Sequence, residues 1–325
     1  MIIPLYWAEG RAQDRQKGKQ VTVRRFGWSD ESQASAQSHA DQRAQEALQR
    51  QLNGAKLPPR ERRVAYNGAD GMPIREEILA KHGKAIITRN SYGAHCLNSP
   101  DVLFADIDFQ QKASFHFALL LTVALLLGAT ALGVSTGSKI LGFGFGFFAL
   151  FFGGALASWL IRKQQALQGG AEGLALRQIE DFAKHHPDWG LRVYRTPAGL
   201  RALATHALFE PSDPQVSACF AAFNTDPIYV RMCLNQQCFR ARVSPKPWRM
   251  GIKNHMRPRP GLWPVVEDRR AARDVWIHAY ESAATAFAAC TFLRQIGQTS
   301  VHPEVADTIA LHDKLCRSES GLPLA

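Results

Sequence analysis

The sequence lacks the short motifs that identify the most common nucleotide-binding and metalloprotease sites. It contains no P-loop, no glycine-rich dinucleotide fingerprint and no HExxH zinc motif. The N-terminal apolar run MIIPLYW is too short for a signal peptide, and its charges follow the run instead of preceding it. These absences exclude several familiar enzyme classes and predict that the chain is not exported.

Acidic side chains are scarce relative to basic ones. The 325 residues include 28 Asp and Glu against 39 Lys and Arg, which gives a formal net charge of +11. From Arg231 to Arg273 there are eleven Lys and Arg residues, and the only acids are Glu267 and Asp268. A basic segment of this kind indicates an anionic partner, such as a phosphate, a nucleic acid or a lipid headgroup.

Charge is almost absent from the block 115–161. Its first half, FHFALLLTVALLLGATALGV, has His116 as its only ionisable residue, and the second, ILGFGFGFFALFFGGALASWLI, has none. Each run is about as long as the roughly 20 residues that cross a bilayer core. The short turn STGSK separates them, so we predict a two-helix transmembrane hairpin. The alternative is a pair of central helices buried in a soluble domain.

Basic residues at the ends of this hairpin predict its orientation. Lys112 precedes the first helix, Arg162 and Lys163 follow the second, and only Lys139 lies in the turn. The positive-inside rule then places both termini in the cytoplasm, with the hairpin in the inner or plasma membrane. The second helix is rich in glycine, which favours close packing against its partner or self-association with a second copy. A transport path usually requires charged or polar residues deep in the membrane. Neither span has a charged residue at that depth, so we interpret the hairpin as an anchor.

The remaining segments predict an α+β cytoplasmic domain with antiparallel strand pairs, interrupted by the transmembrane hairpin. We divide the chain into an N-terminal region of strands, a polar helix and a linker (1–83), a first strand pair (84–114), the hairpin (115–161) and the remainder of the basic domain (162–325). Strands are expected at 191–196, 200–206, 228–234 and 238–244, and helices at 74–83 and 269–297. Because an antiparallel helical hairpin returns the chain to its starting point, strand 102–109 should share a sheet with strands after residue 190.

Two aspartates on the strand before the hairpin are candidate metal ligands. Asp106 and Asp108 occupy alternate positions in VLFADIDF and therefore project from the same face, about 7 Å apart. Carboxylate oxygens of this kind suit Mg²⁺, and phosphoryl-transfer enzymes use them to hold it. The plainer interpretation is a strand that ends in two solvated acids.

Basic residues after the hairpin are candidate phosphate ligands. In CFRARVSPKPWRMG, arginines alternate along a strand and further cations surround Trp248, a combination suited to phosphate capture and base stacking. Anionic lipid headgroups would attract the same charges, and a plain solvated surface is the third possibility. The predicted phosphate-binding residues are Arg195, Arg201, Arg240, Arg242, Lys246 and Arg249.

The Asp-x-Asp strand, followed by RVYRTPAGLRALATH and CFRARVSPKPWR, resembles the catalytic core of archaeo-eukaryotic-type primase-polymerases. That resemblance implies divalent metal on Asp106 and Asp108, and a phosphate-binding histidine on the strand that contains LRALATH. Arg201 stands where this histidine is expected, and His206 comes five residues later. No third carboxylate is assigned.

The other candidate sites are weaker. The six cysteines are expected to be reduced thiols in the cytoplasm. Cys233 and Cys238 lack partners at zinc-finger spacing, so we interpret them as strand residues. His302 and His312 are expected on the surface of the C-terminal tail.

Two functions are therefore open. One is a membrane-tethered, non-enzymatic module whose basic face binds a nucleotide, a nucleic acid or anionic lipid. The other is a Mg²⁺-dependent nucleotidyl- or phosphoryl-transfer enzyme that uses Asp106 and Asp108. The enzyme requires a third acid near this pair and an open basic cleft over it, and the module requires neither.

Overall fold

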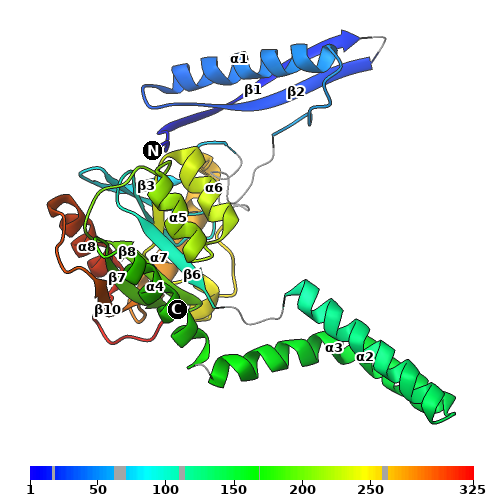
Figure 1. Ribbon diagram of the computed structural model, residues 1–325. Coiled ribbons are helices and arrows are strands. Elements are labelled where there is room, and N and C mark those ends of the chain that lie inside the picture. The colour runs from blue at the N-terminus through cyan, green and yellow to red at the C-terminus, as the bar shows by residue number, and fades with distance from the viewer. Residues whose placement is uncertain (17–18, 62–70, 110–113, 168, 258–262) are drawn as a thin grey trace.

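The computed structural model describes the chain apart from residues 17–18, 62–70, 110–113, 168 and 258–262, and its fold is mixed α+β with antiparallel sheets (Figure 1). Its helices are α1 (Gln33–Leu52), α2 (Phe115–Ser135), α3 (Lys139–Leu167), α4 (Gly170–His185), α5 (Pro214–Ala222), α6 (Pro227–Gln236), α7 (Arg270–Ala284) and α8 (Pro303–Cys316). Its strands are β1 (Tyr6–Gln16), β2 (Lys19–Ser29), β3 (Glu77–His82), β4 (Ala85–Arg89), β5 (His95–Ser99), β6 (Phe104–Asp108), β7 (Gly190–Thr196), β8 (Gly199–Ala204), β9 (Phe239–Arg242) and β10 (Thr291–Gly297).

Two four-stranded sheets form the main body, with strand orders β10-β7-β8-β6 and β3-β4-β5-β9. One continuous apolar core contains residues from both sheets, including Leu97, Phe104, Leu203 and Phe239. Each sheet joins strands from before and after the α2–α3 hairpin, since β6 pairs with β8 and β5 pairs with β9. The expectation that the strand before the hairpin shares a sheet with later strands is therefore confirmed.

A glycine permits the close approach of β6 and β8. Gly199 lies opposite Asp108 in the register, at the start of β8. A Cβ atom at this position would lie 1.9 Å from the carbonyl oxygen of Ile107. No side chain fits there unless the two strands separate.

The N-terminal residues form a separate hairpin and helix, drawn in blue in Figure 1. Strands β1 and β2 pair along eleven residues each, and α1 covers one face of the ribbon. Gly10 in β1 and Gly27 in β2 have no side chain, which lets the α1 backbone at Ala40 lie close to both strands. Ser32 caps α1 by accepting a hydrogen bond from the Ser35 amide at 3.1 Å.

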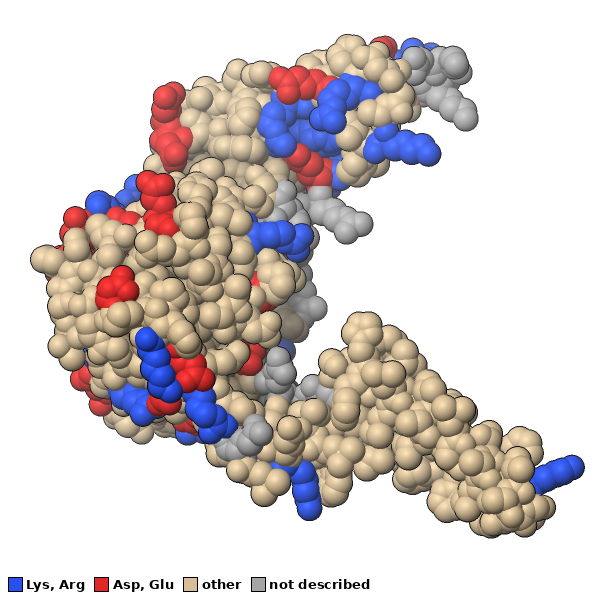
Figure 2. Space-filling view, in the orientation of Figure 1, with Lys and Arg blue, Asp and Glu red and all other residues tan. Residues whose placement is uncertain are grey.

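Helices α2 and α3 project from the body as an antiparallel pair whose visible surface is nearly free of charge (Figures 1 and 2). By length and composition both could cross a membrane, with mean hydropathies of 2.4 and 2.0. Their large side chains point outward, as Leu120 and Phe143 do at 69% and 79% exposure. This exposure contradicts the alternative of two helices buried in a soluble domain.

Small residues bring the two helices of this hairpin together. A Cβ atom on Gly133 would lie 3.0 Å from the Cα atom of Gly142, and one on Gly153 would collide with Thr122. Gly142 and Gly153 of α3 therefore serve packing against α2, one of the two uses predicted from the sequence, whereas Gly144 and Gly154 have open space around them.

Several predicted elements differ in the structure. The segment expected as a helix before Gly83 is strand β3, and the segment expected as a strand after Pro227 is helix α6. The long helix expected at 269–297 divides into α7 and β10, and the segment 84–114, expected to hold one strand pair, contains the three strands β4, β5 and β6. Because residues 227–236 form a helix, β9 pairs with β5 and not with the strand expected at 228–234.

Candidate functional site

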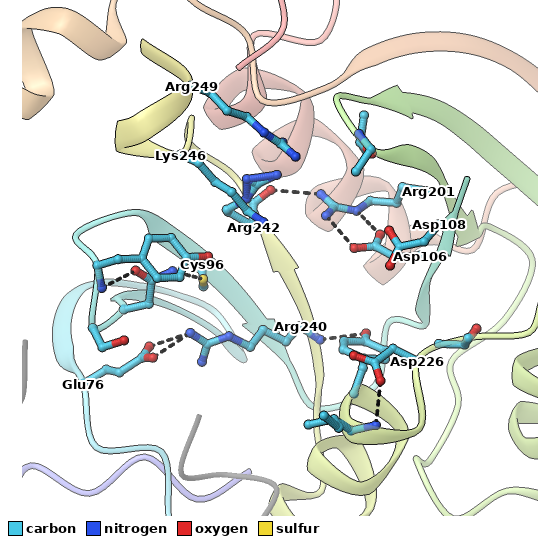
Figure 3. Close-up of a pocket in the computed structure, with 18 residues that line it drawn as sticks. Glu76, Cys96, Asp106, Asp108, Arg201, Asp226, Arg240, Arg242, Lys246 and Arg249 are labelled. Atoms are coloured by element: carbon cyan, nitrogen blue, oxygen red, sulfur yellow. Dashed lines mark hydrogen bonds and ion pairs between the residues drawn. The ribbon is translucent and has the colours of Figure 1, made fainter. Parts of the chain in front are cut away.

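A pocket of about 410 Å³ lies where the edges of the two sheets meet (Figure 3). Strand β6 is the last strand of one sheet and β9 is the last strand of the other. The Tyr229 hydroxyl from α6 bridges them, since it donates to the Phe104 carbonyl at 2.9 Å and accepts from the Arg240 amide at 3.2 Å. The Tyr229 hydroxyl thus ties the backbone of β6 to that of β9 at the pocket.

The pocket brings together most of the residues that the sequence singled out. Asp106 and Asp108 from β6, Arg201 from β8, Arg240 and Arg242 from β9, and Lys246 and Arg249 beyond β9 all line it. The exception is Arg195 on β7, which does not line the pocket and forms an ion pair with Glu172 of α4 at 3.3 Å.

Asp106 is held by a two-pronged ion pair. The guanidinium of Arg201 donates to both of its carboxylate oxygens, at 2.7 and 3.2 Å, and also to the Arg242 carbonyl at 3.0 Å. The Asp106 side chain is about half exposed in the open pocket but lies deep between the two sheets, and this setting alone would raise its pKa; the charge and hydrogen bonds of Arg201 outweigh that effect and lower the pKa. Asp106 therefore carries a negative charge at the centre of the site at neutral pH.

Asp108 lies in the opposite electrostatic situation. Partial burial, with the charges of Asp106 and Asp226, raises its pKa above the ordinary value. Among the described residues it has no ion-pair partner within 4 Å. A cation bound at this edge of the pocket would relieve that repulsion.

Asp226 is a third acid in the same pocket, which the sequence alone did not reveal. It is the N-cap of α6 and accepts a hydrogen bond from the Ile228 amide at 2.9 Å through one carboxylate oxygen. Pro227 follows it at the first helical position. This Asp-Pro pair is a helix-start signal that could have located α6 and its acid.

The facing wall of the pocket is basic and short of anions. Arg242, Lys246 and Arg249 form no ion pair among the described residues, and one buried guanidinium nitrogen of each arginine has no hydrogen-bond partner there. Burial and the two neighbouring arginines lower the pKa of Lys246. Burial and Arg242 likewise lower the pKa of Arg249. Three cations thus crowd one wall without enough negative charge to balance them.

Arg240 has a structural role instead. Its guanidinium donates two hydrogen bonds to Glu76, at 2.7 and 2.8 Å, and one to Asn98 at 3.1 Å. Both partners of this ion pair are more than 90% buried. Arg240 lines the pocket together with the other predicted phosphate ligands, but its ion pair with Glu76 already neutralises its charge.

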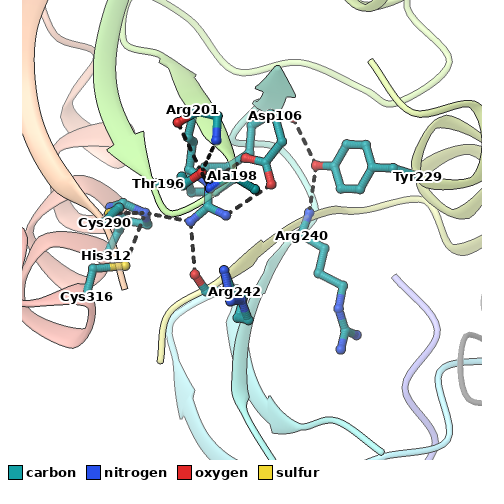
Figure 4. Close-up of polar contacts among 12 residues, drawn as sticks. Asp106, Thr196, Ala198, Arg201, Tyr229, Arg240, Arg242, Cys290, His312 and Cys316 are labelled. Carbon is teal, nitrogen blue, oxygen red and sulfur yellow. Dashed lines mark hydrogen bonds and ion pairs between the residues drawn. The ribbon is translucent and has the colours of Figure 1, made fainter. Parts of the chain in front are cut away.

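The histidines give a mixed result. His206, the late candidate for a phosphate-binding histidine, does not line the pocket; its ring packs against Trp189 and Phe209. His312, expected on the surface, is fully buried and its Nε2 lies 3.3 Å from an Arg201 nitrogen (Figure 4). All six cysteines are buried free thiols. Neither of the two expected on strands lies on one, since Cys233 is in α6 and Cys238 directly precedes β9.

Comparison with protein-family models, with curated proteins and with solved structures found no match.

Proposed function

We propose that the pocket binds a phosphate-bearing small molecule in a protein that α2 and α3 anchor to the cytoplasmic side of the inner or plasma membrane. The observation that carries this proposal is the unbalanced wall of Arg242, Lys246 and Arg249. A buried guanidinium nitrogen without a partner is costly, and a phosphate supplies the oxygens that such donors prefer. Because the wall is recessed, a compact phosphate ester fits it better than a nucleic-acid strand.

The opposite side of the pocket suits a divalent cation. Asp106 and Asp108 share one strand face, and partial burial together with the charges of Asp106 and Asp226 raises the pKa of Asp108, so a cation here would stabilise its ionised form. Magnesium commonly binds through one or two carboxylates together with the phosphates of its ligand. We therefore favour a Mg²⁺–nucleotide, with phosphates on the basic wall and the ion between them and the aspartates.

The test is calorimetric titration of the detergent-solubilised protein with a nucleoside triphosphate in the presence of Mg²⁺. We expect Lys246→Ala and Arg249→Ala each to weaken binding by about ten- to a hundredfold, as for a lost charge-assisted hydrogen bond. Arg195→Ala is the matched control, because it removes the same charge outside the pocket. Equal losses in all three variants would point to general charge attraction and would refute the pocket.

Lipid headgroups carry the same phosphate chemistry, and a second titration separates the two sources. A water-soluble, short-chain anionic phospholipid should bind the wild type and the Lys246→Ala variant equally if the pocket serves a soluble ligand. Binding of this lipid that is lost in Lys246→Ala, with no binding of the triphosphate, would assign the basic wall to lipid.

Magnesium-dependent phosphoryl or nucleotidyl transfer is the second candidate, and Asp226 favours it. A third acid near the aspartate pair and a basic cleft facing them are the two features that an enzyme of this kind requires. Here Mg²⁺ would polarise the phosphate, and the basic wall would stabilise the negative charge that develops on it. Release of pyrophosphate or orthophosphate by the wild type, abolished in Asp108→Asn, is the expected signature; binding without turnover would leave the pocket as a ligand sensor.

A further inference from the structure

A second cluster of reactive side chains lies behind the pocket, on the far side of Arg201 (Figure 4). Cys290 stands just before β10, and His312 and Cys316 are one turn apart on α8. All three are buried, with exposures of 0%, 0% and 1%. Residues four apart on a helix share a face, so α8 presents both of its donors toward Cys290.

The donor atoms already have the spacing of a metal site. The sulfur and nitrogen donors of the three residues lie within 4.8 Å of one another. The His312 Nε2 is 3.4 Å from the Cys316 sulfur and 4.0 Å from the Cys290 sulfur. Tetrahedral zinc, with Zn–S of about 2.3 Å and Zn–N of about 2.0 Å, requires such atoms to be about 3.5 Å apart. The two distances bracket that value.

Surrounding residues orient the histidine for this role. Its Nδ1 lies 3.2 Å from a carboxylate oxygen of Asp313, which in turn is held by Arg192 at 2.7 Å. A histidine that donates through Nδ1 to a carboxylate keeps Nε2 free for a metal, the usual outer-shell arrangement of zinc-bound histidines. The rings of Tyr194 and Phe104 pack beside the imidazole and exclude water from one side.

The positive charge of the neighbouring Arg201 does not exclude a divalent cation from this cluster. Two cysteine thiolates neutralise a divalent cation, so the loaded cluster adds no net charge beside the guanidinium. Arg201 keeps its bonds to Asp106 and to the Arg242 carbonyl when its contact with His312 Nε2 is given up.

We propose that Cys290, His312 and Cys316 form a buried site for zinc or a similar thiophilic ion, in which these three protein donors hold the metal. Among the described residues no fourth cysteine, histidine or carboxylate joins the group. The ion would join α8 to the strand end before β10 directly behind Arg201. This site is separate from the phosphate pocket and stands whether or not the pocket binds a nucleotide.

The test uses full-length protein in detergent, stripped of metal and kept reduced with a phosphine. Titration with Zn²⁺ against a chromophoric chelator should give one ion per chain with submicromolar affinity. Affinity should fall by at least about a hundredfold in Cys290→Ser and in Cys316→Ser, and by about 10- to 100-fold in Asp313→Asn. Cys219→Ser is the control, since that thiol is equally buried but lies outside the cluster.

A spectroscopic readout checks the ligands independently of affinity. Co²⁺ bound by thiolates should give a sulfur-to-metal absorption band that is reduced in each cluster variant and unchanged in Cys219→Ser. Absence of stoichiometric zinc in the wild type, or a cobalt band that survives both cluster substitutions, would overturn the proposal.

Discussion

At the residue scale, the pocket combines two aspartates whose pKa values are shifted in opposite directions, lowered for Asp106 and raised for Asp108. Asp106 is stabilised by Arg201, whereas Asp108 faces two other carboxylates, and Arg242, Lys246 and Arg249 face one another. Like charges gathered in one cleft reduce stability unless a ligand separates them. Groups with shifted pKa values concentrate at functional sites, and the shifted pKa values in this pocket therefore favour a functional role for it.

Substitution of the two aspartates should therefore change stability in opposite directions. Asp106→Asn leaves Arg201 buried without a full counter-charge, so we expect a loss of about 2 kcal/mol, less than for a fully buried pair because Asp106 is half exposed. Asp108→Asn removes repulsion and should raise stability by less than about 1 kcal/mol, because solvent screens this exposed group. Chemical denaturation at pH 7 measures both, and equal losses would contradict the charge assignment.

These effects should depend on pH with opposite signs. The pKa of Asp106 is lowered in the folded protein, so its contribution is present above the unfolded value of about 3.9 and is lost as pH falls through the folded pKa. The pKa of Asp108 is raised, so its ionisation destabilises the fold above that raised pKa. The advantage of Asp108→Asn should accordingly disappear below about pH 3.9, where both states of the wild type are protonated.

The sequence predicted many of the pocket residues but not their roles. Alternation along a strand located Asp106 with Asp108 and Arg240 with Arg242, because side chains two apart share a face. It could not reveal that Glu76 neutralises Arg240 or that Arg201 grips Asp106, since these pairs join residues 164 and 95 positions apart. Asp226 was missed because its helix was interpreted as a strand.

At the scale of elements, the site depends on the contact between β6 and β8. Gly199→Ala should disrupt this contact, because its Cβ would collide with the Ile107 carbonyl and force Asp108 away from its register position. We expect a loss of at least about 2 kcal/mol in the free energy of unfolding. Gly251→Ala is a useful control with open space around the new methyl group, although its positive φ of 82° adds some strain. Similar losses in the two variants would mean that the strand contact is unimportant.

The misassigned elements have physical explanations. Helices α5 and α6 begin with the same Asp-Pro signal, but in α6 the run IYVRMCL has β-branched and aromatic residues that favour a strand. Strand β3 was predicted as a helix from REEILAK, whose residues have high helix propensity, and its pairing with β4 overrides that propensity. Tertiary pairing of this kind lies beyond local sequence.

At the scale of the whole molecule, the apolar hairpin lies outside both sheets. Helices α2 and α3 contact each other and, through α3, the start of α4. We expect that replacing residues 115–161 by a short Gly-Ser linker leaves a protein that is soluble without detergent and unfolds cooperatively, because β6 still pairs with β8. Gel filtration and circular dichroism measure the outcome, and an aggregated product would mean that the hairpin is needed for the fold.

The most direct measurement is calorimetric titration of the intact, detergent-solubilised protein with a nucleoside triphosphate, with and without Mg²⁺. If the pocket holds a phosphate ligand through a bridging ion, one molecule should bind per chain with Mg²⁺ present. Affinity should fall by at least about tenfold without the ion, or with it in Asp108→Asn, which keeps the fold and removes one metal ligand. No binding under either condition would contradict the proposed nucleotide site, and binding unaffected by both changes would contradict the metal.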